Sequence, residues 1–422
     1  MAAATDRARM PGPLSVIRAL EFSHMVMGSA CGMVLADLGA DVIKIEPSSL
    51  GDNTRRLTGS AKGFFPTINR NKRSLCIDIK RPSGLALVRR LATGSDVLLE
   101  NFRPGAMDKL GLGHPALSAI NSRLVYCSCK GFLPGPYEHR AALDEVVQMM
   151  GCLAYMTGMP GTPFRAGSSV NDIMGGLFAV VAVMAALRER NVTGKGSLIQ
   201  SGLFETNMVL VAQPMAQAAI DGKDPPPFGE PGLPKPWPIY DVFDTATAGA
   251  QVFVGVVTET QWRAFCDAFE LSDLLNDPSL ATMVQLAGAR SILTPRIAKV
   301  FGALSKADLM TRCEALGLPY APISRPADLF EDPHLLASGG LLPTELTSAE
   351  NPMGEQLTNY TGLPGLPISF RDGRPGWHRQ PPTVGEHGAE ILAEAGLADA
   401  EIAALVAEGT LTIRPRIAEA AE

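Results

Sequence analysis

The chain has 422 residues, of which 46% are hydrophobic and 19% are charged. This composition is ordinary for a globular protein and excludes disorder for most of the chain. The formal net charge of −6 leaves no basic surface of the kind that binds nucleic acid. A chain of this length is expected to fold as two domains.

The cysteines and the N-terminal residues indicate the cellular compartment of the protein. The seven cysteines are scattered through apolar surroundings, which is typical of reduced thiols in the cytoplasm. Cys127 and Cys129 share one face of an alternating segment, but no second pair follows at zinc spacing, so we expect no metal site. The N-terminal MAAATDRARMPGPL has no apolar core and is not a secretory signal, while a weak transit peptide stays open. We expect a cytoplasmic protein outside the membrane.

The first part of the chain predicts a βαβ unit. Residues 16–22 (VIRALEF) read as a buried strand, a helix follows to about Leu38, and residues 41–46 (DVIKIE) read as a second strand. Two strands joined by a helix predict a parallel sheet with helices on its faces. A nucleotide-type ligand is then expected at the carboxyl end of the first strand.

A dinucleotide is disfavoured at this place. Glu46 ends the second strand and could accept a hydrogen bond from a ribose. However, Gly28 and Gly32 do not form the G-x-G-x-x-G motif, and Met25 and Met27 crowd the turn.

The α/β pattern continues along the chain. We predict strands at residues 74–79, 96–100, 124–130 and 197–200, and helices at residues 82–91, 106–110 and from 141 onward. The second half predicts a strand at residues 251–257 and helices at residues 260–270, 291–301, 306–316, 386–395 and 399–408. The whole pattern predicts an α/β protein.

Residues 69–73 (NRNKR) form a cationic turn before a predicted strand. Clustered cations beside a parallel sheet suit a ligand that carries phosphate. A solvated surface turn explains the same residues, so both interpretations stay open.

The longest apolar run spans residues 173–187 and predicts a helix buried on most sides. It is shorter than the ~20 residues that a membrane span needs. Asp172 is the one carboxylate at its front edge, and either Asn171 or Asp172 is expected to cap the helix, where free N–H groups favour an anion. Taken alone, this stretch favours a capping role for Asp172 over a catalytic one.

Eight ordered motifs extend over nearly the whole chain: LADLGADVIKIEP with Gly51-Asp52, NRNKRSLCIDIK, VLLENFRPGAMDKLG, LVYCSCKGF, ALDEVVQMMG, VNDIMGG, TGKG at residues 193–196 and GEH at residues 385–387. Together they resemble the class III CoA-transferase (CaiB/BaiF) family, which also contains the 2-methylacyl-CoA racemases. The resemblance is highly specific for this superfamily and much less specific for the substrate.

The resemblance implies a Rossmann-like large domain built from both chain ends, with a smaller α/β domain inserted between them. Residues 1–221 and 341–422 would supply the large domain and a return linker, and residues 239–340 the small domain. Residues 222–238 contain seven prolines and fit a stiff linker. Two subunits of this family are threaded through one another, so an interlocked homodimer is expected, with a paralogous heterodimer left open.

The family's nucleophile is an Asp at the start of the long apolar helix, which here is Asp172. It attacks an acyl-CoA thioester, and the reaction passes through a mixed anhydride and an aspartyl-CoA thioester. Asp144 is expected to be a supporting acidic group. No tightly bound cofactor is implied, because coenzyme A enters as the thioester substrate.

The resemblance also assigns the CoA site. The matching positions lie in the loop after the first strand, in the strand after the cationic turn and in the N-F-R-P-G turn: His24, Met25, Val26, Arg73, Ile77, Ile79, Lys80, Asn101, Phe102 and Lys109. Formyl-CoA transferase-type members have Gln at the position of Val26 and Arg at that of Pro47, so contacts from these two positions do not carry over. Their glycine-rich lid is absent as a run, and Gly229 and Gly232 could stand in its place.

One departure favours transfer over racemisation. The racemase branch uses a His-Asp pair for two-base proton transfer, and this chain has Leu143 before Asp144. We therefore expect an acyl-CoA:carboxylate CoA-transferase, with succinyl-CoA as donor and a C4–C5 dicarboxylate or an aromatic acid as acceptor. A racemase and a CoA-binding homologue without catalysis are the alternatives.

Overall fold

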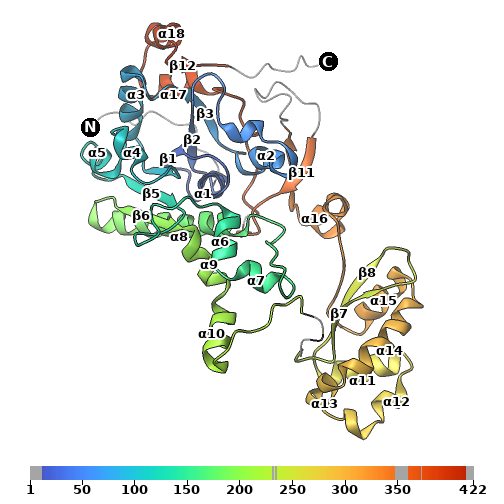
Figure 1. Ribbon diagram of the computed structural model, residues 1–422. Helices are drawn as coiled ribbons and strands as arrows, with labels where there is room; N and C mark the ends of the chain where they lie inside the picture. The colour runs from blue at the N-terminus through green and yellow to red at the C-terminus, as the bar shows by residue number, and fades with distance from the viewer. Residues whose placement is uncertain (1–11, 231, 233–234, 347–359, 372, 415–422) are drawn as a thin grey trace, which may run out of the picture. The chain divides into compact units, whose positions relative to one another are not determined.

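The structure, a computed structural model, describes residues 12–230, 232, 235–346, 360–371 and 373–414 (Figure 1). Met1–Pro227 and Pro333–Glu422 belong to one compact unit, and Phe228–Asp332 form a second. The finer domain limits expected from the sequence stay a prediction.

A seven-stranded sheet is the frame of the first unit, and it confirms the predicted α/β class (Figure 1). The strand order is β12-β3-β2-β1-β4-β5-β6, and only β12 is antiparallel to its neighbour. The strands are β1 (Arg18–Phe22), β2 (Asp41–Glu46), β3 (Arg73–Ile77), β4 (Val97–Glu100), β5 (Val125–Lys130), β6 (Leu198–Gly202) and β12 (Leu411–Thr412).

The strand order places a crevice beside β1. The chain runs outward from β1 through β2 to β3, then returns to β4 on the other side and continues to β6. In a doubly wound sheet of this order, ligands bind where the direction reverses, outside the carboxyl ends of the strands. The loops that follow Phe22 and Glu100 therefore meet at the expected ligand position.

Helices cover both faces of this sheet. One face packs against α1 and α8 around Leu35, Leu99 and Ala179, and the other packs against α3, α17 and α18 around Leu20 and Leu98. The helices of this unit are α1 (Met27–Asp37), α2 (Phe64–Ile68), α3 (Pro82–Thr93), α4 (Ala106–Lys109), α5 (His114–Ser118), α6 (Asp144–Met150), α7 (Leu153–Thr157), α8 (Val170–Thr193), α9 (Leu203–Leu210), α10 (Ala212–Asp221), α16 (Pro333–Ala337), α17 (Gly388–Glu394) and α18 (Asp399–Ala407).

Helix α8 is only partly covered, so the prediction that it is buried on most sides was wrong. Val181 is 64% exposed, and Ile173 and Leu177 are 42% and 39% exposed. The helix has 24 residues and is long and apolar enough to cross a membrane by length and composition alone. It nevertheless packs against α1, α9, β5 and β6 within this unit. The exposed apolar side chains form a stripe on the face turned away from the sheet.

The cationic turn before β3 is buried. Arg70 pairs with Asp37 at 2.7 Å and Lys72 pairs with Glu21 at 2.7 Å, and all four side chains are almost fully buried. The interpretation of this segment as a solvated turn was therefore wrong. The cations bind carboxylates of α1 and β1, and so fix the start of β3 beside them.

The second unit has its own core. Strands β7 (Ile239–Asp244), β8 (Gln251–Val256) and β9 (Tyr320–Pro322) form an antiparallel sheet. Val254, Phe265 and Phe301 are among the buried residues between this sheet and its helices. These helices are α11 (Glu259–Ala268), α12 (Ser272–Leu275), α13 (Met283–Gly288), α14 (Arg290–Gly302) and α15 (Lys306–Ala315).

Several elements were absent from the sequence-based prediction. Residues 203–221 form α9 and α10, and residues 239–244 form β7. An antiparallel pair, β10 (Leu341–Glu345) and β11 (Tyr360–Pro364), lies in the part of the chain expected to contain the return linker. Short strands and helices without a clear apolar period give a weak signal in sequence.

Gly176 sets the spacing between α1 and α8. A Cβ on Gly176 would lie 2.7 Å from the Met27 carbonyl oxygen and 3.1 Å from the Cys31 nitrogen, which are backbone atoms of α1. A Cβ on Gly175 would meet the Met27 side-chain methyl at 2.6 Å, which can move away. Gly176 therefore allows the backbones of α1 and α8 to approach closely, whereas a side chain at Gly175 would displace only the Met27 side chain.

We expect Gly176→Ala to lower the free energy of unfolding by about 1–3 kcal/mol, because overpacking forces the two backbones apart. Gly175→Ala is the matched control and should change stability by less than ~1 kcal/mol, since the alanine also favours the helix. Urea unfolding followed by circular dichroism measures both. Equal losses in the two variants would contradict this account of the helix contact.

Candidate active site

A cavity of about 470 Å3 lies at the carboxyl ends of β1, β4 and β5. Its wall includes the loop after β1, the residue after β4, the end of β5 and the starts of α6 and α8. The cavity therefore occupies the position that the strand order predicts for a ligand.

The loop after β1 is held in an unusual backbone conformation. Met25 has a φ of +57°, which is uncommon for a residue with a side chain. Its N–H donates to the Thr54 hydroxyl at 2.9 Å, and Asp52 accepts hydrogen bonds of 2.8 Å from both the nitrogen and the hydroxyl of Thr54. Asn101 accepts from the His24 nitrogen at 3.1 Å and donates to the His24 carbonyl oxygen at 2.7 Å. Two separate segments thus fix this loop.

Buried ion pairs support the same loop from beneath. Lys44 lies 2.9 Å from Asp52 and 3.3 Å from Glu21, and it donates to the Ser23 carbonyl oxygen at 2.8 Å. Burial alone would raise the pKa of Asp52, but Lys44 and the hydrogen bonds from Thr54 lower it to about 2. Asp52 therefore stays charged near neutral pH and keeps Thr54 in place.

Asp144 caps the helix that carries Asp172. Its Oδ1 atom accepts hydrogen bonds from the Asn171 nitrogen at 2.8 Å and from the Asp172 nitrogen at 3.1 Å. The residue at the N-cap position is Ser169, whose side chain makes no capping bond. The prediction that Asn171 or Asp172 caps α8 was therefore wrong, because a carboxylate from α6 occupies the free N–H groups.

Gln148 connects this cap to the loop that precedes α8. Its amide nitrogen donates to Oδ2 of Asp144, and its amide oxygen accepts from the Ala166 nitrogen at 2.8 Å. Both Asp144 and Gln148 are buried. One side-chain pair on α6 therefore binds the start of α8 and the loop that precedes it.

The Asp172 carboxyl is left partly buried in the cavity wall. Burial raises its pKa to about 7, and the charges of Asp144 and Glu145 act in the same direction. The N–H of Met27 opposes this shift. The sequence predicts that the helix start favours a charged Asp172, but burial, with the nearby charges of Asp144 and Glu145, raises its pKa instead. The result is a poorly solvated carboxyl that is more basic than a surface one.

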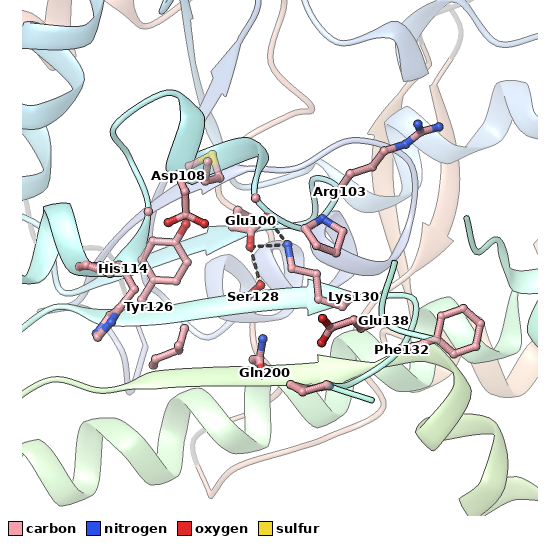
Figure 2. A pocket seen from close by; sticks show the side chains of 17 residues that line it. Glu100, Arg103, Asp108, His114, Tyr126, Ser128, Lys130, Phe132, Glu138 and Gln200 are labelled. Carbon is pink, nitrogen blue, oxygen red and sulfur yellow. Dashed lines mark hydrogen bonds and ion pairs between the residues drawn. The ribbon is translucent and has the colours of Figure 1, made fainter. Parts of the chain in front are cut away.

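Lys130 separates this cavity from a second one. The second cavity has a volume of about 330 Å3 and lies against β4, β5 and β6 (Figure 2). Lys130 contributes to the walls of both cavities. Figure 2 shows its amino group turned toward Glu100, whose two oxygens lie 2.7 and 3.0 Å away, while Ser128 donates to the same carboxylate. The Lys130 charge is therefore neutralised within the sheet.

The structure brings together many of the residues that the sequence analysis singled out. Those in the wall of the first cavity are His24, Met25, Val26, Asn101, Asp144 and Asp172. Phe102 joins them by stacking on His24, with the ring centroids 5.7 Å apart. Five others lie outside this wall: Arg73, the exposed Lys80 and Lys109, and Ile77 and Ile79, which belong to or pack on the sheet core.

Arg73 is the clearest departure from the expected arrangement. Its guanidinium is buried and donates to Asp41 at 2.8 and 2.7 Å, to Glu390 at 3.0 Å and to Glu394 at 2.8 and 3.0 Å. These carboxylates hold every nitrogen of the guanidinium. Its role in CoA binding stays a prediction that these contacts do not support. Glu46 is likewise bound by Arg55, at 2.8 and 2.7 Å, and not left for a ribose.

Four residues of the site, Gln148, Lys130, Glu145 and Arg165, had no role predicted from sequence. Gln148 and Glu145 lie in the ALDEVVQMMG motif and Lys130 in LVYCSCKGF, so their motifs provided a signal but no function. Arg165 lies in a loop without a motif, and only the structure places it on the cavity wall.

The raised pKa of Asp172 has a consequence for stability. The folded protein holds this proton more tightly than the unfolded chain, whose pKa is near 3.8. Ionised Asp172 therefore destabilises the fold increasingly as the pH rises from about 4 to 7, and fully above it. We expect Asp172→Asn to melt at a higher temperature than wild type at about pH 8, with the difference shrinking toward about pH 4.

Thermal unfolding of the ligand-free protein across this pH range measures the difference. Asp399→Asn, at an exposed position in α18, is the control and should show no such trend. A constant difference between Asp172→Asn and wild type at every pH would contradict the assigned pKa.

Comparison with known proteins agrees with this architecture. The model of CoA-transferase family III matches residues 14–388. The succinate–glutarate CoA-transferase of Agrobacterium fabrum is 34% identical over 408 residues, covering 92% of this chain and 97% of that protein. The mouse succinyl-CoA:glutarate CoA-transferase is 30% identical over 389 residues, covering 90% of this chain and 86% of that protein.

A solved structure of a CAIB/BAIF family protein from Brucella suis superposes with a TM-score of 0.78 at 31% identity. The match covers 91% of this chain and 99% of that one. The chain therefore belongs to CoA-transferase family III and is an enzyme of the CoA-transferase class.

Proposed function

We propose that this enzyme moves coenzyme A from a donor acyl-CoA to a carboxylic acid, with Asp172 as the nucleophile. The observation that supports this most is a carboxyl with a pKa of about 7 on the wall of the cavity at the reversal point of the sheet. A nucleophilic carboxylate must be charged yet poorly solvated. Burial supplies the poor solvation, and with a pKa of about 7 Asp172 still ionises near neutral pH.

The reaction begins with attack of a carboxylate oxygen of Asp172 on the thioester carbonyl. The C–S bond breaks, CoA leaves as the thiolate, and a mixed anhydride remains. The thiolate then attacks the aspartyl carbonyl, which releases the donor acid and gives an aspartyl-CoA thioester. The acceptor carboxylate attacks this thioester to form a second anhydride. Return of the thiolate to the acceptor carbonyl releases the new acyl-CoA and restores Asp172.

The chain's own residues have separate tasks in this scheme. Asp144 fixes the start of α8 and raises the pKa of Asp172. The Met27 N–H faces the Asp172 carboxyl and can stabilise the negative charge that develops on its oxygen when the CoA thiolate or the acceptor carboxylate attacks the aspartyl carbonyl. His24, Asn101 and Phe102 offer a stacked, hydrogen-bonded rim for the CoA chain.

We propose succinyl-CoA as the donor and glutarate or another C4–C5 dicarboxylate as the acceptor. The names of the Agrobacterium and mouse relatives support this choice. An aromatic acceptor, which the sequence left open, finds no counterpart in these names. The cytoplasmic location and the lid role of Gly229 and Gly232 remain part of the proposal.

An interlocked homodimer is also part of the proposal. The stripe on α8 includes Ile173, Leu177 and Val181, and Ile220 on α10 is 83% exposed. Apolar side chains that recur along one face of a helix are usually covered in the working assembly. A second copy of the chain would cover them, and a paralogous partner would do so equally well.

The nucleophile can be trapped directly. Incubation with succinyl-CoA followed by hydroxylamine or borohydride should modify Asp172 alone, as located by peptide mass spectrometry. Asp172→Ala should lower CoA transfer by at least roughly 10³-fold, because the covalent route is lost. Asp399→Ala is the control and should keep full activity.

Full activity in Asp172→Ala would contradict the mechanism. CoA binding without exchange of CoA between labelled acids would instead identify a CoA-binding homologue. Solvent deuterium exchange at the α-carbon of a 2-methylacyl-CoA, with no acceptor present, would identify a racemase.

The assembly makes its own prediction. Light scattering of the purified protein should give about 89 kDa, twice the chain mass of 44.7 kDa. Tagged and untagged chains should form hybrids when they are expressed together. They should not form hybrids when mixed after purification, because threaded subunits separate only by unfolding.

A mass near that of one chain would contradict the homodimer and favour an absent paralogous partner. Rapid formation of hybrids after mixing would show an ordinary side-by-side dimer without interlocking.

A further inference from the structure

The first cavity, which is proposed to take dicarboxylates, has three acidic residues and two basic ones in its wall. Asp144, Glu145 and Asp172 all contribute to its wall. A succinyl group would bring a further carboxylate among them at its far end. Like charges at close range destabilise binding, so this distal carboxylate needs a cation within the cavity.

Lys130 does not meet this need. Its amino group already contacts both oxygens of Glu100 and donates to the Phe102 carbonyl oxygen at 2.7 Å (Figure 2). Glu100 is buried, and withdrawing Lys130 would leave a buried carboxylate without its cation. A substrate would have to disrupt the sheet to recruit this lysine.

Arg165 has the opposite properties. Its guanidinium pairs with Glu145, and both side chains are well exposed, at 40% and 46%. Exposed ion pairs contribute only about 0–1 kcal/mol, so a substrate carboxylate can replace Glu145 at little cost. The planar guanidinium also matches a carboxylate with two parallel hydrogen bonds.

Asp144 and Gln148 of α6 set the position of Arg165 relative to Asp172. The next residue, Ala166, donates its N–H to Gln148, and Gln148 donates to Asp144. Asp144 in turn accepts the N–H of Asp172. Arg165 is also held by a bond of 3.0 Å from its Nε to the Ala166 carbonyl oxygen. The cation and the nucleophile thus belong to one hydrogen-bonded frame.

We propose that Arg165 binds the distal carboxylate of a dicarboxylic acyl group whose thioester carbonyl faces Asp172. Glu145 forms an ion pair with Arg165 in the empty cavity, and the substrate carboxylate displaces it. This inference rests on the proposed transferase function and specifies its substrate class. Arg165 thereby selects dicarboxylic over monocarboxylic acyl groups of the same chain length.

The test compares succinyl-CoA with butyryl-CoA, which carries a methyl group in place of the distal carboxylate. In a two-step exchange, kcat/KM for the donor reports only the donor half-reaction. Arg165→Gln should lower kcat/KM for succinyl-CoA by about 10²-fold and change that for butyryl-CoA by less than about threefold. If wild type does not turn over butyryl-CoA, butyryl-CoA is tested as a competitive inhibitor of succinyl-CoA turnover. Arg165→Gln should leave the inhibition constant of butyryl-CoA unchanged.

Three further variants separate binding from a structural role. Arg165→Lys keeps the charge but loses the planar donor pair, so an intermediate loss is expected. Glu145→Gln removes the resident carboxylate and should keep or raise kcat/KM for succinyl-CoA. Arg140→Gln is the matched control, since Arg140 is an exposed loop arginine that lies over the Tyr137 ring, and it should change neither donor.

An equal loss with both donors in Arg165→Gln would overturn the inference, as would the same loss in Glu145→Gln, because either result indicates a loop contact alone. Failure of the proposed function looks different. In that case wild type transfers CoA from neither donor and forms no adduct at Asp172.

Discussion

The contact between Asp144 and the first N–H groups of α8 is the interaction on which the site depends. It satisfies backbone donors that every helix leaves free at its start. It also places a negative charge beside Asp172, whose pKa is raised to about 7. Because Asp144 belongs to α6, the cap joins two helices as well as ending one. A single carboxylate thus fixes the helix start that carries Asp172 and adds to the effect of burial on its pKa.

The sheet provides the frame around this contact. Its strand order brings the loop after β1 and the turn after β4 to one edge, where Asn101 accepts from the N–H of His24 and donates to its carbonyl oxygen. Buried Lys44 and Asp52 support that loop through Thr54. Breaking a buried pair leaves an unpaired charge, which is far more costly than losing a surface pair. The loop therefore keeps a strained Met25 and an inward-facing Met27 N–H without help from a ligand.

The sequence predicted the sheet well because parallel strands between helices have long apolar runs and clear ends. The strands DVIKIE and LVYCSCK lie in the structure where they were expected. The cationic turn could not be understood from sequence, because the partners of Arg70, Lys72 and Arg73 lie on other elements. For the same reason the cap on α8 was assigned to its own residues. The exposed stripe on α8 was missed because an apolar run does not distinguish a buried core from a surface that a second chain covers.

Asp144 and Asp172 show how one environment gives two carboxyls different tasks. Asp144 accepts bonds from two backbone N–H groups and from Gln148, so its charge is met by donors on several sides. Asp172 lies at the same helix start, but the donors there are already taken, and it faces the cavity with the Met27 N–H beside it. The unequal surroundings thus give Asp144 a structural task and leave Asp172 with a pKa raised to about 7. A helix that capped itself with Asp172 would stabilise that charge and weaken the nucleophile. Placing the cap on a neighbouring helix therefore keeps the helix start satisfied while leaving Asp172 reactive.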